Sequence, residues 1–379
     1  MIYLDNSATT KPHPDVLQSF QAVSTSFFAN PSSIHQLGGQ TEKLLLKSKE
    51  QAAALLQVRN DEIIFTSGGT EGNNIAIKGI ALQHQGRGKH IITTEIEHPS
   101  VYEACKSLET LGFKVTYLPV NEHGVVSVKE VERAIQQDTI LISIMYVNNE
   151  IGSIQPIEEI GELAKKHPKL FFHVDYVQGL GKVPLTLENS GIDLCTMSGH
   201  KIHGLKGTGL LYCRNGVKLF PLFHGGDQEH KIRSGTENLA GAVSLVKALR
   251  LIKEREAKGS KELAYLHHYL REELLAIDGV SINTPEQSAP HIMNFSIPGL
   301  KPEVMIHTLG KQGIFISTKS ACSSKDLDES RIIRACGFPA DRSKSALRVS
   351  LSYDNTLEEI KLFISKLKEA LTQLKEVME

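Results

Sequence analysis

Residues 170–201 read LFFHVDYVQGLGKVPLTLENSGIDLCTMSGHK and contain the pattern that decides the fold. Two apolar runs, 170–174 and 193–197, have the length and composition of buried strands. Polar residues that could carry chemistry follow each run at once: Asp175 after the first, and residues 198–201 (SGHK) after the second. Mostly parallel sheets bind ligands at the carboxyl ends of their strands, so the pattern predicts a site just beyond these runs.

Similar apolar runs lie on both sides of this stretch and alternate with helical patterns. The helical patterns cover 73–84, 128–135 and 157–166, and another begins at Pro99. Apolar strands that alternate with helices imply a mostly parallel sheet covered on both faces. We therefore predict an α/β fold with a mostly parallel seven-stranded sheet, whose strands lie at 62–66, 90–94, 114–118, 139–147, 170–174, 193–197 and 209–213.

The C-terminal third has a different pattern. A long helical region covers about 238–276, and short strands at 280–283, 291–295 and 346–350 flank a helix near 302–311. An amphipathic helix ends the chain. A chain of this length usually forms two domains. We expect a large domain at 15–260 and a smaller α+β domain made of 1–14 and 261–379, which carries a loop at about 320–330.

Composition excludes several classes of function. The 379 residues carry a formal net charge of −1, which gives no reason to expect direct binding to nucleic acid or to an anionic membrane. We expect neither a signal peptide nor a transmembrane helix. The five cysteines are scattered, with no C-x-x-C spacing, so we expect no disulfide framework and no metal site. Such cysteines are usual in the cytoplasm, which is the location we expect.

A glycine-rich turn, residues 67–71 (SGGTE), joins the first strand of the sheet to a helix. Glycines such as Gly69 let the backbone approach a ligand closely, and free N–H groups at a helix start attract anions. The Thr70 hydroxyl adds a donor. The turn therefore suits a phosphate group, with an ordinary loop as the alternative. It has neither the lysine of a P-loop nor the spacing of a dinucleotide-binding fingerprint.

Three further residues follow strand ends and suit a pyridine-type cofactor. Asp175 could pair with a protonated ring nitrogen, which increases the capacity of the ring to absorb electrons. As an alternative, Asp175 could cap a helix. Lys201 follows the next strand and is flanked by glycines, which is unusual for a lysine. As an alternative, Lys201 could simply be solvated, as most lysines are. His98, in residues 95–99 (EIEHP), could lie on a planar cofactor and move protons, or could merely begin a helix.

Together these segments resemble the cysteine desulfurases of the NifS/IscS class, within the fold-type-I pyridoxal-phosphate enzymes. The resemblance runs nearly end to end. Any one marker could arise by chance, whereas all of them in order are highly specific. The markers are 3–10 (YLDNSATT), 30–35 (NPSSIH), 67–74 (SGGTEGNN), 97–98 (EH), 147–152 (VNNEIG), 198–201 (SGHK), 233–238 (RSGTEN) and 320–323 (SACS).

The resemblance implies that the cofactor is pyridoxal 5′-phosphate and that Lys201 holds it as a Schiff base. Thr236 would reach the phosphate of a neighbouring subunit, which implies a homodimer with shared sites. The other implied roles are pairing with the pyridine nitrogen (Asp175), contact with the ring hydroxyl (Gln178), stacking and proton transfer (His98), phosphate binding (Gly69, Thr70, Ser198, His200), and binding of the substrate carboxylate (Asn149, which also contacts the cofactor, and Arg348).

By the same resemblance, Cys322 takes the sulfur. It lies in a small, polar stretch that is typical of a mobile loop, although a lone cysteine is more often inert. The thiolate is the nucleophile and would attack the sulfur of L-cysteine, so that L-alanine leaves and Cys322 keeps a persulfide. The other four cysteines lie in apolar or helical contexts and are expected to be structural: Cys105, Cys195, Cys213 and Cys336.

The resemblance leaves the acceptor of the sulfur open: an iron–sulfur scaffold, or an enzyme of tRNA or cofactor thiolation. Two segments depart from the family pattern. Residues 225–232 read GGDQEHKI where relatives often begin GGGQE, and residues 328–330 read DES where many carry EPS. We expect the first departure to affect how partners or subunits meet, and the second to affect the loop.

Three alternatives remain open from the sequence. A selenocysteine lyase or another class V aminotransferase would share Lys201, Asp175 and His98. An aminotransferase would not need Cys322 in a polar loop. A non-enzymatic sulfur carrier or assembly scaffold would bind no cofactor at all.

Overall fold

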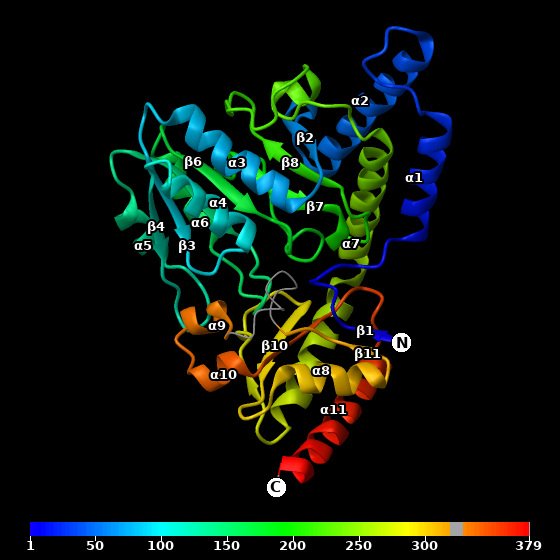
Figure 1. Cartoon of the computed structure of the whole chain (residues 1–379), viewed down its shortest axis with the longest axis vertical. Coiled ribbons are helices and arrows are strands. Elements are labelled where there is room, and N and C mark those ends of the chain that lie inside the picture. The colour runs from blue at the N-terminus through cyan, green and yellow to red at the C-terminus, as the bar shows by residue number, and fades with distance from the viewer. Residues whose placement is uncertain (319–328, 379) are drawn as a thin grey trace.

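A seven-stranded sheet forms the core of the upper part of the molecule in Figure 1, a computed structural model that describes residues 1–318 and 329–378. β8 is antiparallel to both of its neighbours, and the other paired strands are parallel. The predicted mostly parallel sheet is therefore confirmed. In spatial order the strands are β2 (Ile63–Thr66), β8 (Gly209–Cys213), β7 (Leu194–Ser198), β6 (Phe171–Asp175), β5 (Thr139–Met145), β3 (His90–Thr94) and β4 (Lys114–Leu118).

Helices cover both faces of this sheet. Successive side chains of a strand point to opposite faces, so each strand can contribute to an apolar core on either face. In β3, Ile91 packs with α3 (Gly69–His84) and α4 (Pro99–Glu109), whereas Ile92 packs on the other face. That other core includes side chains from α5 (Val128–Ala134), α6 (Ile157–Lys165) and α2 (Gln36–Leu56). With both faces buried, the strands read as continuous apolar runs, which made them visible in the sequence.

The lower part in Figure 1 has its own apolar core around a three-stranded antiparallel sheet. This sheet has the order β12 (Ala346–Ser350), β10 (Ile292–Ser296), β9 (Ser281–Ile282). Two helices, α8 (Pro302–Lys311) and α11 (Leu357–Met378), contribute to the same core. β1 (Ile2–Tyr3) pairs in parallel with β11 (Ile314–Phe315), so the start of the chain joins this lower part.

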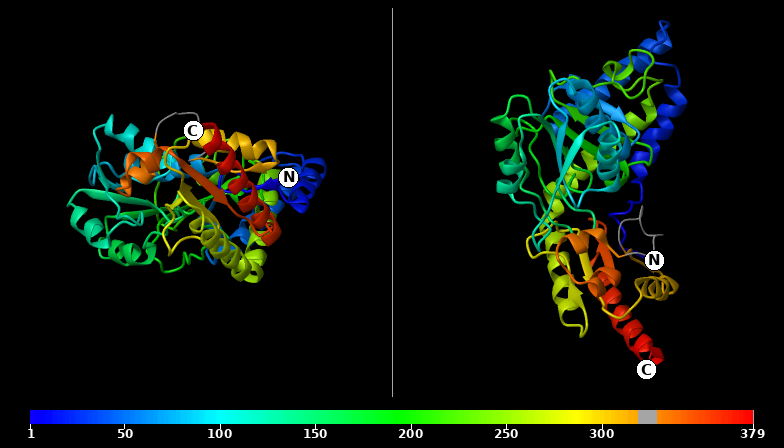
Figure 2. Two further views of the ribbon diagram at one scale, coloured as in Figure 1. Left: turned by 90° about the horizontal axis from the view of Figure 1, so that it is seen from below. Right: turned by 60° about the vertical axis from the view of Figure 1, so that its left-hand side comes forward.

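One 37-residue helix, α7 (Leu239–Leu275), runs through both parts, as Figure 1 and the right-hand view of Figure 2 show. Its first half packs in the core of the large sheet, and its second half packs in the lower core. The long helix predicted over about 238–276 is confirmed. The domain boundary near residue 260 falls inside this continuous helix and stays a prediction.

Several elements were not predicted. α1 (Pro14–Ser26) and α2 pack against α7 at the upper right of Figure 1. Two short helices, α9 (Arg331–Ala335) and α10 (Ala340–Lys344), follow the undescribed segment 319–328. Three single turns complete the structure: η1 (Asn60–Glu62), η2 (Gly199–Lys201) and η3 (Gln228–Lys231). Of the helices described, none combines the length and apolar character needed to cross a membrane.

Candidate functional site

A pocket of about 150 Å³ lies at the carboxyl ends of the parallel strands, where β12 and the N-terminal segment also contribute side chains. Of the predicted site residues that the structure describes, all except Thr236 line it. This placement follows from the topology, because the carboxyl ends of neighbouring parallel strands meet at one edge of the sheet. Residues far apart in the sequence thereby converge on a single cavity.

Asp175 is the last residue of β6 and is buried, with 5% of its surface exposed. Its Oδ1 accepts from the Val177 backbone N–H at 3.0 Å, and its Oδ2 accepts from Asn73 Nδ2 at 2.8 Å. Burial raises the pKa of the carboxyl, while these hydrogen bonds and the Lys201 charge act in the opposite direction. A turn follows Asp175, not a helix, so it is not a helix cap.

Lys201 ends the turn η2, directly after β7, and its side chain crosses to the N-terminal segment. Its Nζ donates to the backbone oxygen of Ala8 at 2.8 Å and also to that of Ser7. The buried Lys182 donates to the Lys201 backbone oxygen at 2.9 Å and so helps to hold the turn in place. A reactive amine therefore reaches the same pocket as the Asp175 carboxylate.

The first turn of α3 meets the end of β7 and forms a cradle that suits a phosphate. The initial N–H groups of a helix have no partner within the helix, and its dipole favours an anion there. A Cβ on Gly69 would lie 3.0 Å from Val177 Cγ2, so a larger residue would crowd the cradle. Ser198 Oγ is buried and has no hydrogen-bond partner among the described residues. A phosphate would satisfy that hydroxyl, with Thr70 at the same edge.

Two histidines flank this cradle, and both are kept neutral by their surroundings. His98 caps the N-terminus of α4, where its Nδ1 accepts from the Ser100 backbone N–H at 3.1 Å. Burial, with smaller effects from Lys201 and Arg331, lowers the pKa of His98 to about 4. Burial and the same lysine lower the pKa of His200 to about 4. His98 both begins a helix and lines the pocket, so the two interpretations do not exclude each other.

Arg348, from β12, brings a guanidinium to the pocket although only 1% of its surface is exposed. Its Nη1 donates to the Asn149 backbone oxygen at 2.7 Å, and its Nη2 pairs with Asp5 Oδ1 at 3.0 Å. Arg348 Nε is buried and has no hydrogen-bond partner within the described part of the chain. The neighbouring Gln178 donates to the Ser7 backbone oxygen at 3.0 Å. The pocket thus has one cationic side suited to a carboxylate.

One predicted site residue that the structure describes, Thr236, does not line this pocket. Thr236 is exposed, in the segment that precedes α7. Cys322 lies outside the described residues. The four other cysteines are buried, as predicted, and burial raises their thiol pKa values, so these thiols stay protonated: Cys105, Cys195, Cys213 and Cys336.

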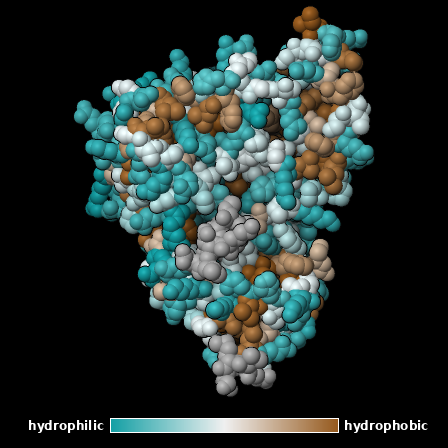
Figure 3. Space-filling model, in the orientation of Figure 1, coloured by the Kyte–Doolittle hydropathy of each residue, from teal (hydrophilic) through white to brown (hydrophobic). Residues whose placement is uncertain are grey.

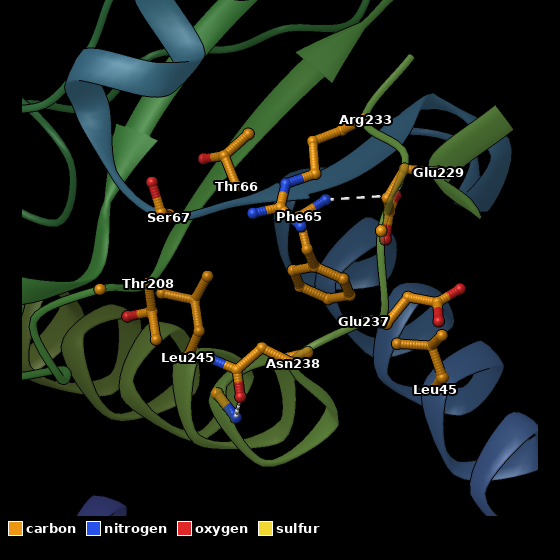
Figure 4. A pocket seen from close by; sticks show the side chains of 15 residues that line it. Leu45, Phe65, Thr66, Ser67, Thr208, Glu229, Arg233, Glu237, Asn238 and Leu245 are labelled. Atoms are coloured by element: carbon orange, nitrogen blue, oxygen red, sulfur yellow. Dashed lines mark hydrogen bonds between the residues drawn. The ribbon is translucent and has the colours of Figure 1, made fainter. Parts of the chain in front are cut away.

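A second pocket, of about 180 Å³, lies beside the segment that carries Thr236 (Figure 4). Figure 4 shows Arg233 and Glu237 on one side of it, with Thr208 and Leu245 on the other. Arg233 Nε is 2.8 Å from Glu71 Oε1. Glu237 Oε2 is buried without a hydrogen-bond partner among the residues described. The departure at 225–232 also reaches this pocket, since Glu229 lines it.

The sequence interpretation missed four polar or backbone contributors to the main pocket: Ser7, Ala8, Asn73 and Ser100. Three of them stand in the marker segments 3–10 and 67–74, and Ser100 follows the marker 97–98 by two residues. The signal was therefore present. The contacts depend on how the N-terminal segment folds back onto Lys201 and how α3 faces α4, which spacing along the chain does not give.

The class-V aminotransferase family model matches residues 2–363. The chain belongs to the class-V aminotransferase family. The chain is 46% identical over 96% of its length to a NifS/IcsS protein homolog of Lactobacillus delbrueckii subsp. bulgaricus, of which 96% is covered. It is 44% identical over 99% of its length to the cysteine desulfurase IscS of Methanosarcina thermophila, of which 93% is covered.

Solved structures agree with this assignment. A NifS-like protein superposes with a TM-score of 0.92 at 37% identity, covering 98% of this chain and 99% of that one. SspA in complex with cysteine superposes with a TM-score of 0.81 at 32% identity, covering 93% of this chain and 99% of that one. The class-V aminotransferase fold therefore accounts for nearly the whole chain.

Proposed function

We propose that the protein is a cysteine desulfurase that uses pyridoxal 5′-phosphate to remove sulfur from L-cysteine, giving L-alanine and a persulfide on Cys322. The single observation that carries the proposal is the meeting of Lys201, Asp175 and Arg348 in one pocket. Relatives named cysteine desulfurase, 40 to 44% identical over nearly the whole chain, support the same activity.

The residues present fit the cofactor. Its phosphate would occupy the cradle formed by Gly69, Thr70, Ser198 and His200. There the phosphate would accept a hydrogen bond from the Ser198 hydroxyl, which has no partner among the described residues. Its ring nitrogen would pair with Asp175, Gln178 would contact its ring hydroxyl, and Lys201 would hold it covalently. When bound, the cofactor supplies an aromatic electron sink that stabilises negative charge at the carbon atoms of the substrate.

The chain's own residues would then bind and orient the amino acid. Arg348 and Asn149 would hold the carboxylate of cysteine, Arg348 as a two-pronged donor. Once displaced by the substrate amine, Lys201 would take the Cα proton as a base. His98, neutral because its pKa is lowered to about 4, would assist proton transfer as a hydrogen-bond donor.

The sulfur-transfer step follows from the roles proposed for Cys322. Its thiolate attacks the substrate sulfur, the S–S bond forms, and the Cβ–S bond breaks. The electron pair of the broken bond and a proton end on carbon, which gives alanine. The persulfide would then pass to an acceptor protein, an iron–sulfur scaffold or a thiolation enzyme.

We also propose that the protein works as a homodimer in which Thr236 contacts the phosphate bound by the partner. The exposure of Thr236 supports this. So do exposed apolar side chains near α1 and α2, including Phe28 and Ile34, in the region where brown atoms gather at the upper right of Figure 3. Sedimentation of the purified protein tests this proposal. A strictly monomeric enzyme with full activity would contradict it.

The decisive experiment compares the purified wild type with Cys322→Ala and Cys336→Ala. With L-cysteine and an added thiol that reduces the persulfide, the wild type should release alanine and sulfide in equal amounts. Cys322→Ala should keep the yellow cofactor and form little sulfide. Cys336→Ala changes a buried cysteine of the core and should behave like the wild type.

Each outcome separates the alternatives. Full sulfide release by Cys322→Ala would defeat the role of that thiol, and amino-group transfer without sulfide would indicate an aminotransferase. A marked preference for selenocysteine would indicate a lyase. Protein purified without a visible cofactor band would favour a non-enzymatic carrier or scaffold.

A further inference from the structure

We propose that Asn73 and Ser100 are positioning residues that connect the Asp175 carboxylate to the His98 imidazole and hold neutral His98 with its proton on Nε2. The proposal rests on the proposed function, which places Asp175 and His98 in the active site. It adds two residues from near the starts of α3 and α4, and it specifies which nitrogen of His98 carries the proton.

The first step is the Asn73 amide, which is buried with 1% of its residue surface exposed. Its Nδ2 donates to Asp175 Oδ2 and to Ser100 Oγ, both at 2.8 Å. An amide nitrogen has two hydrogens, so both are used. A flipped amide would place Oδ1 against the Asp175 carboxylate, acceptor against acceptor. The network therefore fixes the orientation of Asn73.

The second step is Ser100, which approaches His98 Nδ1 with two groups. Its backbone N–H donates to Nδ1 at 3.1 Å, and its Oγ lies 2.8 Å from the same nitrogen. A backbone N–H can only donate, so Nδ1 must be an unprotonated acceptor. Asn73 already donates to Ser100 Oγ, which leaves the hydroxyl proton to point at Nδ1. The proton of neutral His98 is therefore on Nε2.

Charged groups from several elements surround this relay. Lys201 from η2 and Arg331 from α9 are cations that lower the pKa of His98, after the larger effect of burial. The buried Glu97 has its pKa raised to about 8, mainly by burial. A proton on Nδ1 would break both hydrogen bonds from Ser100 and the N-terminal cap of α4. His98 thus presents its Nε2–H as a hydrogen-bond donor.

A purely structural role would use Asn73 and Ser100 only to pack α3 against α4. That role predicts loss of stability on substitution, with no specific effect on the ring nitrogens of His98. The relay predicts such an effect, and it predicts that the effect of Asn73 passes through the Ser100 hydroxyl.

The test uses the holoenzyme labelled with ¹⁵N in its histidine rings, with the His98 signals assigned by their loss in His98→Gln. At neutral pH the wild type should show a protonated Nε2 and an unprotonated Nδ1. In Ser100→Ala, the Nδ1 resonance should shift toward the position of a nitrogen without a hydrogen bond. Asn73→Ala should give a smaller shift in the same direction, because the hydroxyl loses its fixed orientation.

The double variant decides between the two roles, because residues that act through one another are not additive. In the Ser100→Ala background, Asn73→Ala should cause no further shift of Nδ1. Ser100→Thr retains a hydroxyl and should restore the wild-type signal. Asn74→Ala is the matched control, since the Asn74 amide bonds only to the Thr70 backbone oxygen among the described residues. If Asn73→Ala does not fold, Asn73→Ser replaces it in the same cycle.

A proton on Nδ1 in the wild type would overturn the proposal. An Asn73 shift of equal size in both backgrounds, or no shift in either, would also overturn it. The readout needs no turnover of cysteine, so failure of the desulfurase assay and failure of the relay are separate results.

Discussion

The Arg348 guanidinium on β12 pairs with the Asp5 carboxylate at 3.0 Å and donates to the Asn149 backbone oxygen at 2.7 Å. This relationship joins three distant segments of the chain at the edge of the pocket. Asp5 keeps the guanidinium in place, while burial raises the pKa of Asp5 and the arginine acts against that rise. The guanidinium is thus fixed at the edge of the pocket, where the carboxylate of the substrate is proposed to bind.

Arg348→Lys should therefore raise the KM for L-cysteine by about 10-fold or more, because a charged two-pronged hydrogen bond is replaced by a point charge. Steady-state kinetics with alanine detection measures this. Arg342→Lys is the control, since Arg342 bonds to Asn283 and Ile282 in the lower part of the molecule. An unchanged KM in Arg348→Lys would remove this residue from substrate binding.

Lys201→Ala should abolish the covalent bond between protein and cofactor. Borohydride reduction of the wild type should fix the cofactor to the peptide that contains Lys201, and mass spectrometry of the digest detects the adduct. The same treatment of Lys201→Ala should give no adduct at any lysine. Lys206→Ala, at an exposed position in the next turn, should label like the wild type. An adduct on another lysine in the wild type would refute the assignment.

Lys49→Met should lower the free energy of unfolding by about 3 kcal/mol, because it leaves a buried carboxylate without its partner. Lys49 Nζ and Glu229 Oε2 are 2.6 Å apart, with side-chain exposures of 10% and 3%. Burial raises the pKa of Glu229 in spite of this lysine. Urea denaturation monitored by circular dichroism measures the change.

The double variant Lys49→Met/Glu229→Leu should recover much of this loss, since an apolar pair replaces the ion pair. Arg133→Met, which breaks an exposed pair with Glu130, should change stability by less than about 1 kcal/mol. Equal effects of Lys49→Met and Arg133→Met would contradict the prediction.

Stability should fall as the pH drops below about 6.5, the ordinary pKa of histidine. His173 is fully buried, and burial lowers its pKa to about 3. Between these values the unfolded chain binds a proton that the folded chain does not. This one residue should therefore reduce the unfolding free energy by about 1.4 kcal/mol per pH unit. Urea titrations at pH 7, 6 and 5 measure the slope.

His173→Gln removes this titration and should flatten the slope by that amount. Its ring nitrogens contact the hydroxyls of Ser143 and Thr196, which an amide can also bond. The exposed His123 gives the control, because His123→Gln should leave the slope unchanged. An unaltered slope in His173→Gln would show that this histidine does not contribute.

Most strands of the large sheet were predictable from sequence because they are buried on both faces, whereas the edge strand β4 is only partly buried. The predicted strand 114–118 matches β4, and 209–213 matches β8. The prediction of 139–147 extended two residues beyond β5, since the chain stays apolar after Met145 while it leaves the sheet. α1 and α2 escaped prediction because their buried stripes are narrow and their remaining surface is polar or exposed.

The site was predictable where a residue lies at or just beyond the end of a strand, as Asp175 and Lys201 do. The pairing of Arg348 with Asp5 was not predictable, because it depends on the packing of β12 beside the N-terminal segment. The relay through Asn73 and Ser100 escaped for a similar reason. Both residues lie near the starts of helices whose mutual orientation is set by the sheet beneath them, not by local spacing.

The pairing of β1 with β11 has a consequence for biosynthesis. Ser7 and Ala8, which contact the Lys201 side chain, follow a strand whose partner, Ile314–Phe315, is translated more than 300 residues later. The first residues therefore leave the ribosome long before β11, their hydrogen-bonding partner, has been synthesised. The pocket stays incomplete until most of the polypeptide has emerged, so a truncated nascent chain should not assemble this lysine's surroundings.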